Sequence, residues 1–212
     1  MPFWRRKPYH RGTMLESANK ARASGRIRKA ISGYAKILEH DPEDWPVHAR
    51  IAPLLAHRGR WKEARGSFTA AADGYMKQGF SDKAIAVWTV AAQSFPEEVE
   101  YPERIANELV RRGRKADAVK SLLDCRSRLR ARRQRPIAVL LLRQVLLLQP
   151  LHFEATLDLA RLLIKEDGRK EALKLLRDLR FHVSGRHVRR LRAAQFWIAP
   201  SLGSALDWLL AR

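Results

Sequence analysis

The feature of this chain that most constrains its fold is an alanine that recurs in a fixed local frame. It returns at alternating intervals of 34 and 20 residues. Four residues after each alanine stands a large apolar side chain, and seven residues after it an apolar or small one. Those offsets place the side chains on one face of an α-helix, so each alanine predicts a packed helix. The six alanines are Ala30, Ala64, Ala84, Ala118, Ala138 and Ala172.

Glycines and prolines mark where these helices begin and end. A glycine precedes four of the alanines by four or five residues, at Gly25, Gly59, Gly113 and Gly168. Glycine past a helix end adopts the left-handed conformation that terminates the helix. A proline closes three of the apolar helical runs, at Pro42, Pro96 and Pro150, which are 54 residues apart. The pattern therefore predicts helix hairpins, and no run alternates with period two for long enough to predict a strand.

This pattern resembles the tetratricopeptide repeat (TPR) family over residues ~11–180. The family places a small residue and a larger apolar one on the first helix of each repeat, glycine in the turn, and alanine, an aromatic residue and proline on the second helix. The resemblance implies an all-α, right-handed helical-repeat solenoid of antiparallel hairpins with about 12 helices. The pairs on the first helices are Ala18/Ala21, Ala52/Leu55, Ala72/Tyr75, Ala106/Leu109 and Ala160/Leu163.

The 20-residue intervals depart from a regular TPR array. An interval of 20 leaves no room for an extra helix, so the helices opened by Ala64 and Ala118 are expected to serve two neighbouring hairpins each. This predicts a helix pair at 13–41 and three-helix units of period 54 at 44–97, 98–151 and 152–200. Pro53 falls inside the expected helix 45–58, so it should kink that helix, or the helix begins later.

The expected domain organisation follows from these repeats. We expect a basic and aromatic N-terminal arm over residues 1–12, a TPR-like domain over 13–181, and C-terminal capping helices over 182–212. The capping helices are expected at 186–198 and 202–211, because a repeat array needs its end covered.

Several kinds of chemistry are not expected. The sequence lacks a Gly-rich phosphate loop and the common hydrolase and zinc-protease motifs, so we predict no catalytic residue, no cofactor, no metal site and no small-molecule substrate. Cys125, the lone cysteine, excludes an intramolecular disulfide framework and is interpreted as a packed thiol. No export signal or spanning segment is recognised, so cytoplasm is the expected compartment.

Positive charge is concentrated in three stretches without acidic residues. The chain carries 42 Lys and Arg against 22 Asp and Glu, a formal net charge of +20. Residues 1–15, 125–150 and 179–206 hold most of the excess. On a helix, Arg126, Arg130 and Arg133 would form one row, and like charges at that spacing repel unless an anion faces them. Two interpretations stay open here: an anion-facing row, or a solvated helix end that complements the helix dipole.

The resemblance also implies a binding surface. In the TPR family, side chains of the first helices line the inner, concave wall, and here five of six such places hold a permanent cation. This predicts a basic groove that binds an acidic segment of another protein. One variant of the family binds chaperone tails with a lysine and an asparagine; Asn19 is present here, but Leu15 stands in the place of the lysine. The predicted groove residues are Arg22, Lys77, Arg111, Arg130, Arg161 and Lys165.

The two termini leave the function less constrained. Phe3, Trp4 and Tyr9 are interleaved with the basic residues of 5–11, and Trp197 and Trp208 follow the arginines of 186–192. Such mixtures suit an anionic membrane surface or nucleic acid, and they suit equally a cap whose aromatic rings are packed. The leading hypothesis is a non-enzymatic scaffold that binds an acidic protein segment. The alternatives are a non-specific nucleic-acid-binding accessory protein and a peripheral adaptor at an anionic membrane.

Overall fold

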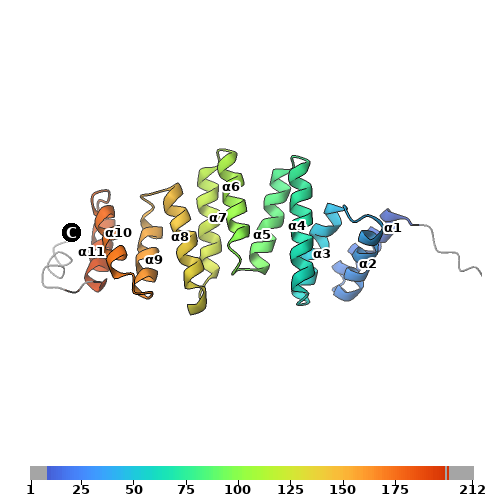
Figure 1. Cartoon of the computed structure of the whole chain (residues 1–212), viewed down its shortest axis with the longest axis horizontal. Coiled ribbons are helices and arrows are strands. Elements are labelled where there is room, and N and C mark those ends of the chain that lie inside the picture. The colour runs from blue at the N-terminus through green and yellow to red at the C-terminus, as the bar shows by residue number, and fades with distance from the viewer. Residues whose placement is uncertain (1–8, 199, 201–212) are drawn as a thin grey trace, which may run out of the picture. The chain divides into compact units, whose positions relative to one another are not determined.

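The described part of the chain is entirely helical. A computed structural model describes residues 9–198 and residue 200, and it contains no strand within them (Figure 1). The fold is therefore all-α. Its helices are α1 (Arg11–Ala23), α2 (Ile27–His40), α3 (Trp45–His57), α4 (Trp61–Lys77), α5 (Ser81–Ser94), α6 (Glu100–Arg111), α7 (Lys115–Arg128), the 3-10 turn η1 (Arg132–Gln134), α8 (Arg135–Leu148), α9 (Phe153–Ile164), α10 (Arg169–Arg180) and α11 (Arg186–Ile198).

The chain divides into two compact units with a boundary between Phe95 and Pro96. In the first unit each of the helices α1 to α5 packs against the next one along the chain, and α3 also contacts α5. In the second unit α6 to α11 pack in the same sequential way, and α11 also contacts α9. Short connections join neighbouring helices within each unit (Figure 1).

The six repeated alanines lie in the cores of these units. Ala30, Ala64, Ala84, Ala118 and Ala172 are completely buried, and Ala138 is nearly so. The large side chains four residues further on are buried as well, and Tyr34, Phe68 and Leu142 are among the largest fully buried groups. Each such side chain contributes about 1.5–3 kcal/mol through removal of apolar surface from water. The alanine that lets two helices approach and the large residue one turn later thus form the recurring unit of the core.

The helices opened by Ala64 and Ala118 each pack against two neighbours. α4 contacts both α3 and α5, and α7 contacts both α6 and α8. Within the first unit, α4 lies close to α3 at Gly74. A Cβ atom at Gly74 would lie 2.1 Å from the indole ring of Trp45. Only glycine leaves room for Trp45 at this crossing.

α3 begins at Trp45 and runs through Pro53 to His57. The side chain of Asp44 caps it by accepting a hydrogen bond from the backbone N–H of Val47 at 3.2 Å. The alternative expectation, that this helix begins later than residue 45, is therefore wrong. Asp44 is itself buried and forms two hydrogen bonds with Arg11, at 2.6 and 2.9 Å.

The fourth glycine turn differs from the expected one. Gly25, Gly59 and Gly113 have φ of +70°, +73° and +74°, as predicted for residues that end a helix. Gly168 instead has φ of −82° and precedes α10 as its N-cap residue. Asp167 takes the left-handed conformation in its place, with φ of +60°. The string around Gly168 is one residue shorter than the other three, which moves the left-handed position back by one residue.

Some of the expected segments lie outside the described residues. These are most of the N-terminal arm, including Phe3 and Trp4, and the capping helix predicted at 202–211. The other predicted capping helix, 186–198, is observed as α11. α1 begins at Arg11, two residues before the predicted start of the first hairpin.

Candidate partner-binding groove

The second unit has a groove between α9 and α11. Each helix contributes residues at offsets of three, four and seven, which share one helical face. The groove has a volume of about 370 Å³ and a mostly apolar lining. Trp197 stands at one edge with 79% of its surface exposed. The lining residues are Leu157, Ala160, Arg161, Ile164, Arg190, Ala193, Ala194, Trp197 and Ile198.

An ion pair joins the two walls of this groove. Both terminal nitrogens of Arg190 on α11 donate to the carboxylate of Glu154 on α9, at 2.5 and 3.0 Å. The guanidinium carbon of Arg190 also lies 5.2 Å from the ring centre of Phe153. The hydrogen bond from Arg190 lowers the pKa of Glu154, although partial burial of this carboxyl opposes the shift. The charge of Arg190 is thus neutralised locally.

Arg161 differs from Arg190 because it has no ion-pair or hydrogen-bond partner among residues 9–198. It is exposed and lies on the groove face of α9. Lys165 follows it by one helical turn and is also exposed. An unpaired cation beside an apolar floor can bind a segment that presents an apolar side chain next to a carboxylate.

The other predicted groove residues do not line the α9–α11 groove. Arg22 and Lys77 are exposed in the last turns of α1 and α4, in the first unit. Arg111 ends α6 and donates to the buried carboxylate of Glu108 at 2.7 and 2.8 Å. Arg130 is exposed in the connection between α7 and η1. Of the six predicted cations, Arg161 alone lines this groove.

The predicted helical row of Arg126, Arg130 and Arg133 is wrong, because α7 ends at Arg128. The equivalent position 54 residues before Arg133 is Gly79, which ends α4 with φ of +77°. Arg133 is not among the described residues with a positive φ; it lies in η1, after α7 has ended. The replacement of glycine by arginine removes the residue that favours the left-handed turn.

Most of these arginines have an acidic partner elsewhere in the same unit. Arg126 lies 2.9 Å from Asp158 of α9, and one of its terminal nitrogens donates to the carbonyl of Leu129. Arg133 lies 3.1 Å from Glu97. Anions therefore do face Arg126 and Arg133, and they are carboxylates of the protein itself. Two further pairs are Arg135 with Glu166 at 3.4 Å and Arg143 with Glu171 at 2.9 Å.

Two other residues singled out in the sequence have structural surroundings. Asn19 accepts a hydrogen bond from the hydroxyl of Tyr34 at 2.6 Å, which ties α1 to α2. Cys125 is half-buried, and this burial raises the pKa of its thiol, although the charge of Arg128 opposes the shift. A raised pKa leaves little reactive thiolate near neutral pH.

The described residues contain no group of His, Cys, Asp and Glu that could hold a metal ion. No helix within residues 9–198 combines the length and the apolar character needed to cross a membrane.

Comparison with known proteins finds a family model that matches part of the chain. Residues 15–75 match the family model described as tetratricopeptide repeat. No curated protein matches the chain in sequence.

Several solved structures are similar to this chain. TPR-like repeats from Podospora anserina share 18% identity, with coverage of 90% of this chain and 97% of theirs and a TM-score of 0.47. A TPR protein from Parabacteroides merdae shares 14% identity, with coverage of 94% and 91% and a TM-score of 0.30. PilF from Pseudomonas aeruginosa shares 16% identity, with coverage of 94% and 87% and a TM-score of 0.29. The sequence match to the tetratricopeptide repeat model thus covers the first part of the chain, residues 15–75.

Proposed function

We propose that this protein is a non-enzymatic scaffold that binds an acidic segment of a partner protein in the α9–α11 groove. The TPR family generally provides protein-interaction scaffolds, and the finer assignment rests on one observation. Arg161, exposed and without an internal partner among the described residues, lies beside an apolar floor. A carboxylate on the partner would pair with Arg161 and Lys165, and an apolar side chain would contact Ile164 and Trp197.

Nucleic acid is a less favoured ligand. The arginine-rich stretch 125–150 motivated that alternative, and four of its arginines are paired with carboxylates of the same unit. Paired arginines offer less charge for phosphate contacts, which supply most non-specific affinity for nucleic acid. No observation on the described residues favours an anionic membrane. Cytoplasm as the compartment stays a prediction.

The proposed division of the chain keeps the expected boundaries except at the start of α1, which begins at Arg11 and not at residue 13. We propose an arm over 1–10, a repeat domain over 11–181 and a cap over 182–212, in which α11 also forms one wall of the groove. The cap would then serve both to cover α10 and to bind the partner.

The test is a pull-down with mass spectrometry at ~150 mM salt, where weak charge attraction is screened. Wild type is compared with Arg161→Glu/Lys165→Glu and with the control Lys174→Glu/Arg177→Glu. The control reverses two exposed cations of α10 outside the groove. We expect a discrete acidic partner that the groove variant loses and the control retains. Equal loss in both variants, or retention in both, would contradict the proposal.

A further inference from the structure

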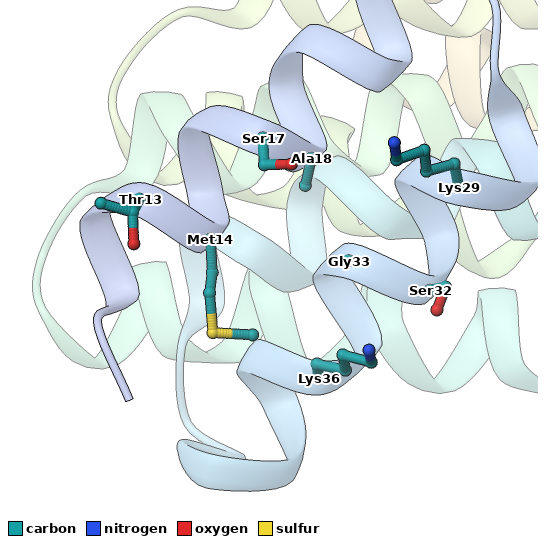
Figure 2. A pocket seen from close by; sticks show the side chains of 8 residues that line it. All are labelled: Thr13, Met14, Ser17, Ala18, Lys29, Ser32, Gly33 and Lys36. Carbon is teal, nitrogen blue, oxygen red and sulfur yellow. The ribbon is translucent and has the colours of Figure 1, made fainter. Parts of the chain in front are cut away.

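A second hollow lies in the first unit, between α1 and α2. Figure 2 shows polar side chains from both helices around it. It has a volume of about 430 Å³. Its floor is where the two helices come closest, since a Cβ atom on Gly33 would lie 2.9 Å from the Cβ of Ala18. The remaining lining residues are Thr13, Met14, Ser17, Lys29, Ser32 and Lys36.

Two lysines and two serines give this hollow its chemistry. Lys29, Ser32 and Lys36 are spaced by three and four residues, so they share one face of α2 and Ser32 lies between the lysines. Ser17 faces them from α1 (Figure 2). All four side chains are exposed, and none has a hydrogen-bond or ion-pair partner within the described chain. The hollow therefore offers two ammonium groups and two hydroxyl groups without internal acceptors.

The same face of later helices is apolar and covered. Thr13 stands five residues before the small residue Ala18, and Ser17 stands one residue before it. In α3 the corresponding residues are Val47 and Ile51, and in α9 they are Ala155 and Leu159. These four are buried, and α3 and α9 pack against the helices that precede them. The polar residues of α1 are unsuited to an apolar helix, so the hollow favours a polar ligand.

We propose that the α1–α2 hollow binds a phosphorylated serine or threonine side chain on a partner protein. A phosphate monoester carries about −1.5 to −2 charges and three acceptor oxygens at neutral pH. Two lysines match that charge, and the hydroxyls of Ser17 and Ser32 supply directional donors between them. The lysines are two helical turns apart, about 10 Å along the axis, and their flexible stems allow both ammonium groups to reach a phosphate near Ser32.

The volume of the hollow favours a phosphate on a peptide over a free ion. A space of about 430 Å³ far exceeds a single phosphate group and leaves room for the segment that carries it. Met14 lies at the same end of the hollow as Lys36 and offers apolar contact to a neighbouring side chain (Figure 2). This site rests on the general scaffold role, but it is independent of the α9–α11 groove.

The test measures binding of a fluorescent peptide library with one fixed central phosphoserine, at ~150 mM salt, by anisotropy. The same library with serine or aspartate at the fixed position, and inorganic phosphate as a competitor, are the comparison probes. Isotope-labelled protein then locates the site through its amide NMR shifts. We expect binding of the phosphoserine library alone, shifts that cluster at residues 13–18 and 29–36, and poor competition by inorganic phosphate.

Two variants separate specific recognition from general attraction to a basic protein. Lys29→Glu/Lys36→Glu should abolish binding, whereas the control Arg58→Glu/Lys62→Glu should retain it within about threefold, because distant charges are screened. Ser17→Ala/Ser32→Ala keeps the charge and should weaken binding about tenfold through loss of two charge-assisted hydrogen bonds. Circular dichroism checks that each variant is folded.

Four results would overturn the proposal. They are unchanged affinity in the serine variant, equal affinity for the aspartate library, competition by inorganic phosphate as strong as by the unlabelled phosphopeptide, and equal loss in the Arg58/Lys62 control. If binding of the phosphoserine library survives Arg161→Glu/Lys165→Glu, the α1–α2 hollow acts independently of the α9–α11 groove. Failure of either site is thus distinguishable from failure of the other.

Discussion

The guanidinium of Arg190 holds both carboxylate oxygens of Glu154, at 2.5 and 3.0 Å, and so joins the first turn of α9 to α11. The pair spans the two walls of the proposed groove. It also sets which cation is available to a ligand, because it occupies Arg190, whereas Arg161 acts on Glu154 through its charge alone and has no ion-pair or hydrogen-bond partner among the described residues.

Replacement of Arg190 by methionine should raise the pKa of Glu154 towards the usual glutamate range of about 4.3, because methionine cannot donate the hydrogen bond that lowers it. Because the pKa of Glu154 is lowered in the folded protein, the ion pair stabilises the fold at pH values above the usual glutamate pKa. This stabilisation is lost as the pH falls through the folded-state pKa. An NMR titration of the Glu154 carboxyl carbon measures the shift. Glu171, which pairs with Arg143, serves as the internal control. An unchanged pKa of Glu154 would mean that Arg190 does not hold it in solution.

Two glycines of α4 should respond in opposite ways to alanine. Gly74→Ala should destabilise the protein by roughly 1–3 kcal/mol, because the new methyl group would overlap the indole of Trp45. Gly66→Ala, with nothing within 4 Å of the added Cβ, should stabilise it by about 0.5–1 kcal/mol through better helix propensity. Urea unfolding of both variants measures the difference. Similar effects at both positions would contradict the close crossing of α3 and α4.

The left-handed residue before α10 offers a test of backbone strain. Asp167→Gly should raise the free energy of unfolding by about 0.5–1 kcal/mol, because glycine adopts a φ of +60° without the cost that other residues incur. Alanine lacks the conformational freedom of glycine and tolerates the left-handed region less well than aspartate does. Asp167→Ala should therefore lower the free energy of unfolding. Thermal unfolding of the two variants gives the comparison. A gain from alanine as large as that from glycine would show that the side chain, not the backbone, determines the effect.

Arg126 and Arg130 should differ although they belong to the same basic stretch. Arg126 is largely buried and pairs with Asp158, whereas Arg130 is exposed. Arg126→Ala should therefore cost about 1 kcal/mol, an amount limited by the partial exposure of Asp158. Arg130→Ala should change stability by less than about 0.5 kcal/mol. If chemical denaturation shows equal costs, Arg126 has no special role in joining α7 to α9.

The repeat pattern predicted the core well because its signal is local. Ala64 and Phe68 stand one turn apart in the sequence and are both buried, so a spacing rule is sufficient to find them. α11 was predicted by a different argument, that the end of a repeat array needs to be covered. Turns were less predictable. A one-residue shortening moved the left-handed residue from Gly168 to Asp167, and α7 ends at Arg128, before the predicted row of arginines is complete.

The proposed binding surface was predictable only in part. The family resemblance predicted Arg161 as a groove residue. The α9–α11 groove is also lined by Arg190 and Trp197, which the sequence pattern assigned to a terminal cap. Their spacing with Ala193 and Ala194 on one face of a helix was the signal that could have identified them. The partners of the central arginines could not be found in this way. Asp158 lies 32 residues from Arg126, and only tertiary packing brings the two together.

The most direct test of the proposed function places a photo-crosslinking amino acid at Trp197, at the edge of the α9–α11 groove. The crosslinked partner peptide is then identified by mass spectrometry, with and without Arg161→Glu/Lys165→Glu. The account predicts one predominant partner segment that carries Asp or Glu beside an apolar residue, and loss of the crosslink in the groove variant. A crosslink to a segment without acidic residues, or one that the charge reversal leaves unchanged, would contradict it.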